Sequence, residues 1–261
     1  MEKIKKLVNQ VLGYFGLQLV QSKAQYRLLQ RYEMLYNKDN VNRILAEINP
    51  KLINTFEYPK MHSQIGQDIF VLGVLNLKKD GFFVEFGATN GKSLSNTYIL
   101  EKEFGWSGIC SEPALNWRKE LKNNRKCHID FRCVYSSSGK RINFKQTQFP
   151  ELSTIADFED RDLYSAYRKK GEYYEVITVT LVELLDTYNA PAEIDYISID
   201  TEGSELEILK EFDFIKYKVR VFTIEHNFTP NREEILKLME SKGYKRVYQE
   251  ISDFDDWYLL T

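Results

Sequence analysis

The stretch Gly81-Phe82-Phe83-Val84-Glu85-Phe86-Gly87-Ala88-Thr89-Asn90-Gly91-Lys92-Ser93 decides the fold of this 261-residue chain. Its first half is apolar and β-prone except at Glu85, which predicts a buried strand. Gly87 and Gly91 then bracket a turn that is too tight for ordinary side chains. Apolar residues at helical spacing follow, so we expect a helix over residues 93–104. A strand, a glycine turn and a helix in this order are typical of a loop that places a nucleotide-type cofactor at a helix N-terminus.

Glu85 narrows the kind of cofactor. A carboxylate at the end of a buried strand must find hydrogen-bond donors or face a cationic ligand. A pyrophosphate would be repelled there, and the loop lacks the G-x-G-x-x-G glycines of dinucleotide sites. A ligand with an ammonium group at its near end fits better, as in S-adenosylmethionine (SAM). The alternative is a core glutamate that pairs with a lysine.

A second acid supports the cofactor interpretation. Gly108-Ile109-Cys110-Ser111-Glu112-Pro113 is a short apolar strand that ends in a carboxylate. A Rossmann-like sheet places its ribose-binding acid at about this distance after the glycine loop. A helix-capping role for Glu112 is the alternative, but the loop and both acids together favour a cofactor site.

The rest of the chain alternates between strand and helix patterns. Strands are expected over residues 128–135, 141–144, 176–180, 194–200 and 219–225, helices over 117–122, 181–188, 204–212 and 231–242, and a closing antiparallel pair over 244–249 and 257–260. This order predicts an α/β fold with a doubly wound, mostly parallel sheet, which binds ligands beyond the carboxyl ends of its strands. Glu85, Glu112, Asp200 and Glu225 stand at such ends, so we expect all four to face one crevice.

Residues 1–60 read as a helical N-terminal extension, and residues 61–261 as the catalytic domain. Ile4, Leu7, Val8, Val11, Leu12 and Phe15 form an apolar helical stripe beside Lys3, Lys5 and Lys6. Such a helix could rest on an anionic membrane surface, although packing on a partner or on the main domain is favoured. No signal peptide or membrane-spanning run is evident.

Charge and cysteine content restrict the partners. The net charge of −2 and the pI near 6.1 give no basic field for a nucleic acid, so a nucleic-acid substrate is not expected. Three cysteines without a C-x-x-C pair favour a reducing cytoplasm. Residues 145–175 are polar and aromatic without a clear period, which predicts a loop or lid whose tyrosines help to form the acceptor pocket.

Four motifs follow one another in the chain: Ser63-Gln64-Ile65-Gly66-Gln67-Asp68, then Phe83-Val84-Glu85-Phe86-Gly87-Ala88-Thr89-Asn90-Gly91 continuing to Ser95-Asn96-Thr97, then Glu112-Pro113, and Asp200-Thr201-Glu202-Gly203-Ser204-Glu205. With them, residues 62–260 resemble the FkbM-type SAM-dependent methyltransferases of the seven-stranded Rossmann-like class. Thr89 departs slightly from the usual loop, and the N-terminal extension lies outside the resemblance.

The resemblance implies O-methylation of a small-molecule acceptor, typically a sugar, glycan-precursor or polyketide hydroxyl, with SAM as cofactor. The residues expected to bind SAM are Ser63, Gln67, Glu85, Gly87, Asn90, Gly91, Ser95, Asn96, Glu112 and Pro113. Two rivals stay open. One is an NAD(P)-dependent or other nucleotide-dependent Rossmann enzyme, and the other is a non-catalytic binding module with the same fold.

A hydroxyl acceptor also needs a base or a metal ion. Asp200, Glu225 and Asn227 resemble the oxygen ligands of Mg²⁺-dependent O-methyltransferases. Without a metal, His226 is the candidate base, because its reference pKa lies near neutrality. Asp200, Glu202 and His226 are therefore the expected catalytic residues. The plain alternative for Asp200-Thr201-Glu202-Gly203 is a helix N-terminus that acids cap.

Overall fold

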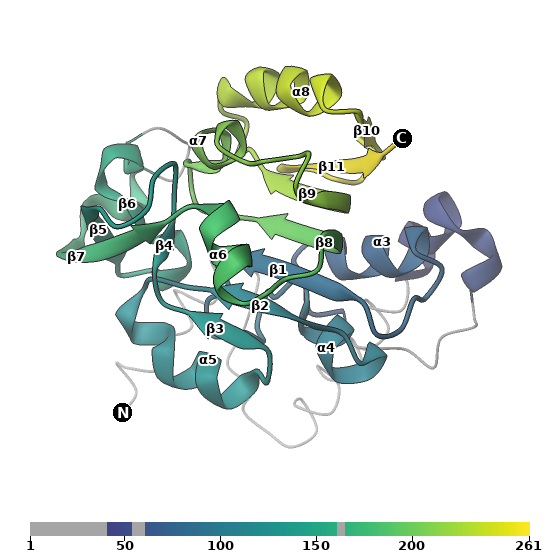
Figure 1. Cartoon of the computed structure of the whole chain (residues 1–261), viewed down its shortest axis with the longest axis horizontal. Coiled ribbons are helices and arrows are strands. Elements are labelled where there is room, and N and C mark those ends of the chain that lie inside the picture. Colours follow the sequence, from purple (N-terminus) through teal and green to yellow (C-terminus); the bar gives the residue numbers. More distant parts are fainter. Residues whose placement is uncertain (1–40, 54–60, 161–164) are drawn as a thin grey trace, which may run out of the picture.

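The computed structural model describes residues 41–53, 61–160 and 165–261. Within these ranges the strands form two sheets (Figure 1). The larger is a seven-stranded sheet of order β10-β11-β9-β8-β1-β2-β3, parallel except where β11 pairs with β9 and β10. Its strands are β1 (Phe82–Phe86), β2 (Ser107–Ser111), β3 (His128–Asp130), β8 (Glu193–Ile199), β9 (Lys218–Glu225), β10 (Tyr244–Val247) and β11 (Asp255–Leu260). The predicted Rossmann-like sheet with an antiparallel C-terminal pair is confirmed.

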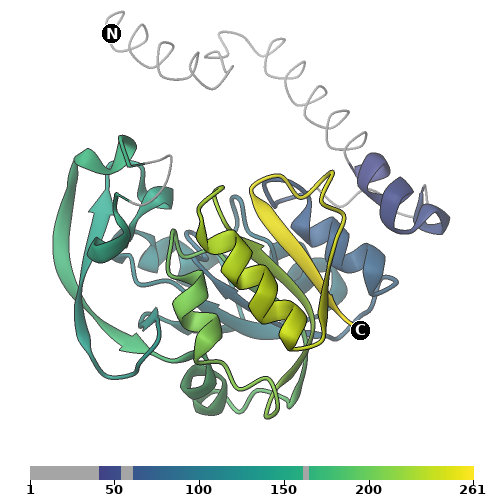
Figure 2. The same cartoon turned by 90° about the horizontal axis from the view of Figure 1, so that it is seen from above.

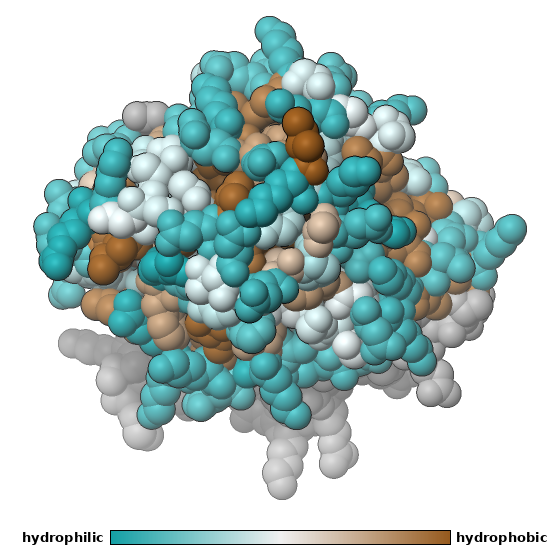
Figure 3. All heavy atoms as spheres, in the orientation of Figure 1, coloured by the Kyte–Doolittle hydropathy of each residue, from teal (hydrophilic) through white to brown (hydrophobic). Residues whose placement is uncertain are grey.

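Helices cover both faces of this sheet (Figures 1 and 2). Those of one face are α3 (Gln67–Val74), α4 (Tyr98–Phe104) and α5 (Arg118–Asn124), and those of the other are α6 (Leu181–Thr187), α7 (Glu205–Lys210) and α8 (Asn231–Ser241). Successive strand residues point to opposite faces. Accordingly, Phe83 packs in the core beneath α3 and α4, whereas Val84 and Phe86 pack in the core beneath α6, α7 and α8. The outer surface drawn in Figure 3 is mostly hydrophilic, and its apolar residues lie in small separate groups.

The smaller sheet has four strands in the order β4-β7-β5-β6. They are β4 (Cys133–Val134), β5 (Arg141–Thr147), β6 (Thr154–Ile155) and β7 (Gly171–Val179). In Figure 1 the arrowheads of β1, β8 and β9 point toward β5, β6 and β7. We call residues 141–160 and 165–179 the cap, because they stand beyond the carboxyl ends of the main sheet. Short 3₁₀ helices complete the fold at Pro50–Leu52, Leu115–Trp117, Pro150–Leu152, Ala156–Phe158 and Tyr167–Lys169.

One prediction about this region was wrong, and another was correct only in part. The single strand expected over residues 128–135 is two strands, and each belongs to a different sheet. The segment expected to be a loop or lid, residues 145–175, starts and ends in strands, because β5 pairs with β7 from Arg141 to Thr147. Between these strands, the described residues form turns, short 3₁₀ helices and the two-residue strand β6. The charged and aromatic residues of β7 hid its strand character, because six of its first seven positions lie on the surface or only partly buried.

The helix after the glycine turn begins at Tyr98, five residues later than predicted. Asn90 Oδ1 accepts hydrogen bonds from the backbone N–H groups of Lys92 and Ser93, both at 2.9 Å, and so forms a local turn. Leu94 then adopts a positive φ of 62°, which interrupts any helix. The expected delivery of a ligand to a helix N-terminus is therefore not what this loop does.

Part of the predicted N-terminal extension belongs to the main core. Residues 41–48 are helical, and Val41, Ile44 and Leu45 pack in one cluster with Phe70 of α3. The apolar stripe from Ile4 to Phe15 lies outside the described residues. Among the residues that the structure describes, no helix has the length and apolar character needed to cross a bilayer.

Candidate active site

A cavity opens between the carboxyl ends of the main sheet and the cap. The sheet contributes residues at or just after the ends of β1, β2, β8 and β9: Phe86, Gly87, Glu112, Pro113, Asp200, Thr201, Glu202 and Glu225. The cap contributes Phe144, Pro150, Glu151, Leu152, Ser153 and Ile155. Four strand-end acids were expected to face one crevice. Glu112, Asp200 and Glu225 line this cavity, but Glu85 does not.

Gly87 allows the first loop to lie directly against the end of β8. Its φ is 68°, a left-handed conformation that side chains disfavour. A Cβ at this position would stand 2.0 Å from the carbonyl oxygen of Asp200. Only glycine therefore brings the turn after β1 into contact with Asp200, which explains the sequence signal in structural terms.

Glu112 joins the loops that follow β1 and β2. Its Oε2 accepts a hydrogen bond from Thr89 N at 2.9 Å, and its Oε1 accepts one from Ala114 N at 2.8 Å. Each carboxylate oxygen keeps a lone pair, so the group could still accept from the two hydroxyls of a ribose. Burial raises the pKa of Glu112 to about 7, although both backbone hydrogen bonds act in the opposite direction. This geometry fits the ribose-binding role that was predicted.

Glu85 has a different role from the one predicted. Its carboxylate accepts hydrogen bonds from Ser95 Oγ at 3.0 Å, Asn96 N at 2.7 Å and Thr97 Oγ1 at 2.6 Å. It also forms a buried ion pair with Arg125 Nη1 at 3.1 Å. Glu85 does not line the cavity, because it points to the same face as Phe83, toward α4 and α5. The alternative interpretation, a core glutamate that pairs with a cationic side chain, is therefore correct, although the partner is an arginine and not a lysine.

The other loop residues expected to touch the cofactor mainly hold the loops in place. Ser95 Oγ donates to Glu85, and Asn96 Nδ2 donates to Ser198 Oγ at 2.8 Å. Asn90 closes the turn described above, and the Gly91 carbonyl accepts from Arg125 Nη1 at 3.3 Å. None of these four residues lines the cavity.

Two residues of the motif before the first strand, Ser63 and Gln67, hold neighbouring parts of the chain in place. Ser63 Oγ donates to Asp68 Oδ1 at 2.5 Å and accepts from Gly66 N at 3.1 Å. Gln67 Nε2 donates to Asp255 Oδ2 at 2.8 Å and so links α3 to β11. Neither Ser63 nor Gln67 lines the cavity, but Gln64 between them does.

Glu205 organises the turn after β8. Its Oε1 accepts hydrogen bonds from Thr201 N, Thr201 Oγ1 and Gly203 N, at 3.0, 2.9 and 3.0 Å. This is the capping role that the plain alternative gave to acids of the turn. Glu205 fills the capping role, and Asp200 and Glu202 of the same turn line the cavity.

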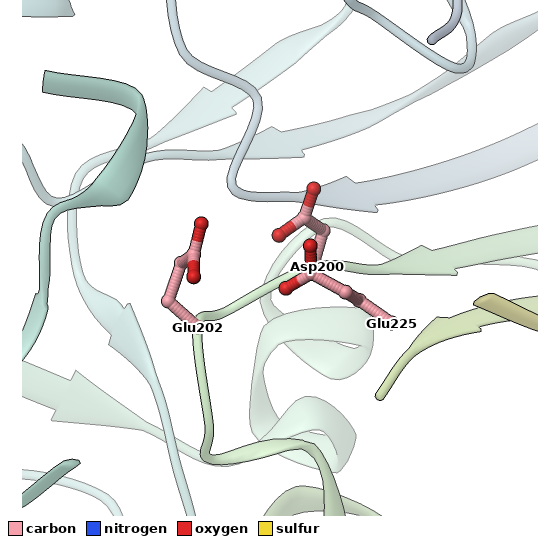
Figure 4. A group of neighbouring side chains, drawn as sticks. All are labelled: Asp200, Glu202 and Glu225. Carbon is pink, nitrogen blue, oxygen red and sulfur yellow. The ribbon is translucent and has the colours of Figure 1, made fainter. Parts of the chain in front are cut away.

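Asp200, Glu202 and Glu225 form a group that we call the acid cluster (Figure 4). One carboxylate oxygen from each of them lies within 4.8 Å of the others. Burial raises the pKa of Asp200 to about 7, with the charge of Glu205 adding to the effect. Burial and the charge of Asp200 raise the pKa of Glu225 well above its usual range. Such shifts are typical of a site that takes up a proton or a cation.

Glu202 connects the acid cluster to the cap. Its carboxylate pairs with the buried guanidinium of Arg168, whose Nε also donates to the Leu152 carbonyl at 2.8 Å. Glu202 has a φ of 60°, a conformation that costs about 1–3 kcal/mol for a residue with a side chain. Thr154 Oγ1 donates to the Glu202 carbonyl at 2.9 Å. Glu202 therefore fixes the cap to the acid cluster.

His226 does not face the cavity. Its Nδ1 accepts a hydrogen bond from Phe228 N at 3.0 Å, and its Nε2 lies 3.7 Å from Asp256 Oδ1. Burial lowers the pKa of His226 to about 4. The structure therefore turns this ring away from the acceptor side, whereas its neighbour Asn227 lies beside Glu202, with Nδ2 3.4 Å from Oε2.

Sequence reasoning missed several residues of the cavity. Thr89, Leu94, Ser204 and Phe254 line it, as do the cap residues named above. Gln64, Thr89 and Ser204 carried a signal, because all three lie in quoted motifs. Most of the cap residues that line the cavity lie in the segment 145–175, which was expected to help to form the acceptor pocket. The tyrosines named for that role are not the lining residues, since Tyr167, Tyr173 and Tyr174 do not line the cavity.

Comparison with protein families gives one match that covers more than half of the chain. The family described as "Methyltransferase FkbM domain" matches residues 85–246. That range holds Gly87, Glu112 and the whole acid cluster. A search of curated proteins gave no significant match.

Solved structures give distant matches. A precorrin-6y C5,15-methyltransferase from Geobacter metallireducens is 12% identical with a TM-score of 0.40, covering 73% of this chain and 77% of that one. A TehB-like SAM-dependent methyltransferase from Corynebacterium glutamicum is 9% identical with a TM-score of 0.38, and the match covers 89% of this chain and 100% of that one. A ribosomal protein L11 methylase from Lactobacillus delbrueckii is 9% identical with a TM-score of 0.37, and the match covers 75% of this chain and 76% of that one.

Proposed function

Because this chain belongs to the FkbM family of SAM-dependent methyltransferases, we propose that it methylates a hydroxyl group of a sugar, a glycan precursor or a related small natural product. The observation that carries the proposal is the division of the cavity. Gly87 and Glu112 follow β1 and β2, whereas the acid cluster follows β8 and β9. The cap covers both sides, because it contacts Leu115 after β2 and Glu202 after β8. One half suits the cofactor and the other half suits an acceptor.

The cap side has the composition of a sugar site. Phe144, Leu152 and Ile155 offer apolar contacts, and Glu151 and Ser153 offer hydrogen-bond groups among them. A sugar presents apolar C–H faces and hydroxylated edges, so a lining that mixes the two kinds of side chain can contact both. The polar side chains of Gln64, Thr201 and Ser204 extend the same pattern to the sheet side.

The chemistry asks little of the protein beyond alignment and proton removal. When bound, SAM supplies a methyl group activated on a sulfonium. The acceptor oxygen forms the new C–O bond as the C–S bond breaks, and the C–S electron pair stays on sulfur. The hydroxyl proton passes to a carboxylate of the acid cluster. Asp200 suits this step, because its pKa near 7 is matched to neutral pH.

A substitution at Glu112 tests whether this half of the cavity binds the cofactor. We expect the Glu112→Gln variant to bind S-adenosylhomocysteine (SAH) more weakly by about 1–3 kcal/mol, or roughly 5- to 150-fold, because an amide accepts with one oxygen only. Calorimetry measures the dissociation constant, and Glu120→Gln on the exposed side of α5 is the control. An unchanged dissociation constant in Glu112→Gln would move the ribose to another part of the cavity.

The pH dependence of binding follows from the same residue. The pKa of Glu112 is raised to about 7, so the group is ionised above pH 7 and protonated below it. A protonated carboxyl loses an acceptor position, and we therefore expect SAH affinity to fall between pH 8 and pH 6. Calorimetry at both pH values checks this, and the Glu112→Gln variant should show a flatter profile. An equal slope in both proteins would contradict the assignment.

The acceptor class is tested directly. The enzyme is incubated with isotope-labelled SAM and a panel of sugars, nucleotide sugars, polyketide alcohols, amines and thiols, and the methylated products are identified by mass spectrometry. The proposal expects transfer to a sugar or polyketide hydroxyl. Transfer to nitrogen or sulfur alone would overturn the acceptor class and leave the family assignment intact.

A further inference from the structure

The acid cluster concentrates negative charge where water is largely excluded. Glu202 is paired with Arg168. In the described part of the chain, neither Asp200 nor Glu225 forms an ion pair with a lysine, arginine or histidine, although their oxygens lie within 4.8 Å of each other. Glu225 is buried and Asp200 is half-buried, and two such carboxylates at this distance cannot both be ionised at low cost unless a cation lies between them.

Glu225 provides an independent observation. The residue is 7% exposed, and its Oε2 is buried without a hydrogen-bond partner. An unpartnered buried oxygen of this kind is rare in native proteins and costs about 1–3 kcal/mol. Figure 4 shows the three carboxyl groups directed toward a common space, with Asp200 and Glu225 side by side and Glu202 across from them.

The donor set indicates the kind of cation. All three ligand atoms are carboxylate oxygens, which are the donors of hard divalent ions such as Mg²⁺ and Ca²⁺. Asn227, which the sequence suggested as a ligand, places its amide nitrogen toward Glu202 and so orients that carboxylate. A cation that takes one oxygen from each acid leaves its remaining positions for water or acceptor oxygens.

We propose that Asp200, Glu202 and Glu225 bind one hard divalent cation, which holds the acceptor hydroxyl in the cavity. The role in catalysis rests on the proposed function, whereas the binding itself does not. A bound cation lowers the pKa of a coordinated hydroxyl. The hydroxyl proton then passes to the carboxylate oxygen of Asp200 that the cation leaves free. Two neighbouring hydroxyls of a sugar would occupy two positions of the same ion.

Manganese serves as the probe, because Mn²⁺ replaces Mg²⁺ in oxygen sites and is detected by paramagnetic resonance. The full chain, free of SAM, is titrated with Mn²⁺, and Mg²⁺ is then added as competitor. We expect one bound Mn²⁺ per chain, released by Mg²⁺, and at least 10-fold weaker binding in the Glu225→Gln variant. Glu234→Gln on the exposed side of α8 is the matched control, because its carboxylate is 61% exposed and pairs with Lys210 outside the cavity.

Thermal unfolding gives a second measurement. Mg²⁺ should raise the melting temperature of the wild-type chain and of Glu234→Gln, and have a much smaller effect on Glu225→Gln. Equal Mn²⁺ affinity in the wild type and Glu225→Gln, or no stoichiometric binding to a folded wild type, overturns the inference. SAH calorimetry on the same samples separates the two proposals. SAH binding without Mn²⁺ binding refutes the cation site alone, and Mn²⁺ binding without SAH binding refutes the proposed function alone.

Discussion

The Asp200→Asn variant is expected to lose at least about 10²-fold in methyl transfer while its affinity for SAH stays within a few-fold, because a general base or metal ligand typically contributes that much. Asp200 lies at the end of β8, in contact with the Gly87 turn and within the acid cluster. The amide keeps the shape of the side chain but accepts no proton at neutral pH. Turnover is measured by SAH release with the best acceptor from the panel.

The control for Asp200 is Glu193→Gln at the opposite end of the same strand. The Glu193 side chain is 70% exposed and pairs with Arg220 on the surface, so its loss should leave turnover unchanged. Near-normal turnover in Asp200→Asn would make the strand-end acids structural. Loss of SAH binding together with turnover would instead place Asp200 in the cofactor half of the cavity.

The Arg125→Met variant is expected to lose about 3–5 kcal/mol of folding free energy, because removal of one partner leaves buried charge uncompensated. Arg125 has no exposed side-chain surface and pairs with Glu85 at 3.1 Å and with Glu101 at 2.8 Å. Its guanidinium also donates to Thr97 Oγ1 at 2.7 Å, so the change also removes a support of the loop after β1. Urea denaturation followed by circular dichroism measures the loss.

Two further variants test the reason for this loss. Arg141→Met removes a surface arginine whose side chain is 72% exposed and pairs with the exposed Glu175, and its effect should stay within about 0.5 kcal/mol. The double variant Arg125→Met with Glu85→Gln should recover part of the loss, since a neutral amide replaces the unpaired carboxylate. If Arg125→Met is as stable as the wild type, then Glu85 finds other compensation and the loop does not depend on the ion pair.

The sequence alone determined the order of the elements and the place of the cofactor turn. β1 lies in the apolar first half of the opening stretch, as predicted, and β2, β8, β9 and α8 differ from their predicted ranges by one or two residues. These elements could be predicted because their apolar residues follow the period of a strand or a helix. This period depends only on residues that are close together in the chain. Gly87 could be predicted because glycine tolerates the backbone conformation that a tight turn needs. Glu112 could be predicted because an acid at a strand end, at that distance after a glycine loop, is typical of a ribose-binding site.

Only the tertiary structure decided which acid does what. Glu85 and Glu112 look alike in the sequence, but Glu85 points into the helix layer, where Arg125 arrives from 40 positions further along the chain. Likewise Glu225 faces the cavity and His226 faces Asp256, because adjacent side chains leave the chain in opposite directions. The cap was predicted only in part. Strands were expected over 141–144 and 176–180, which lie within β5 and β7, but the exposed first half of β7 has no strand period, and the pairing of β5 with β7 is a tertiary contact.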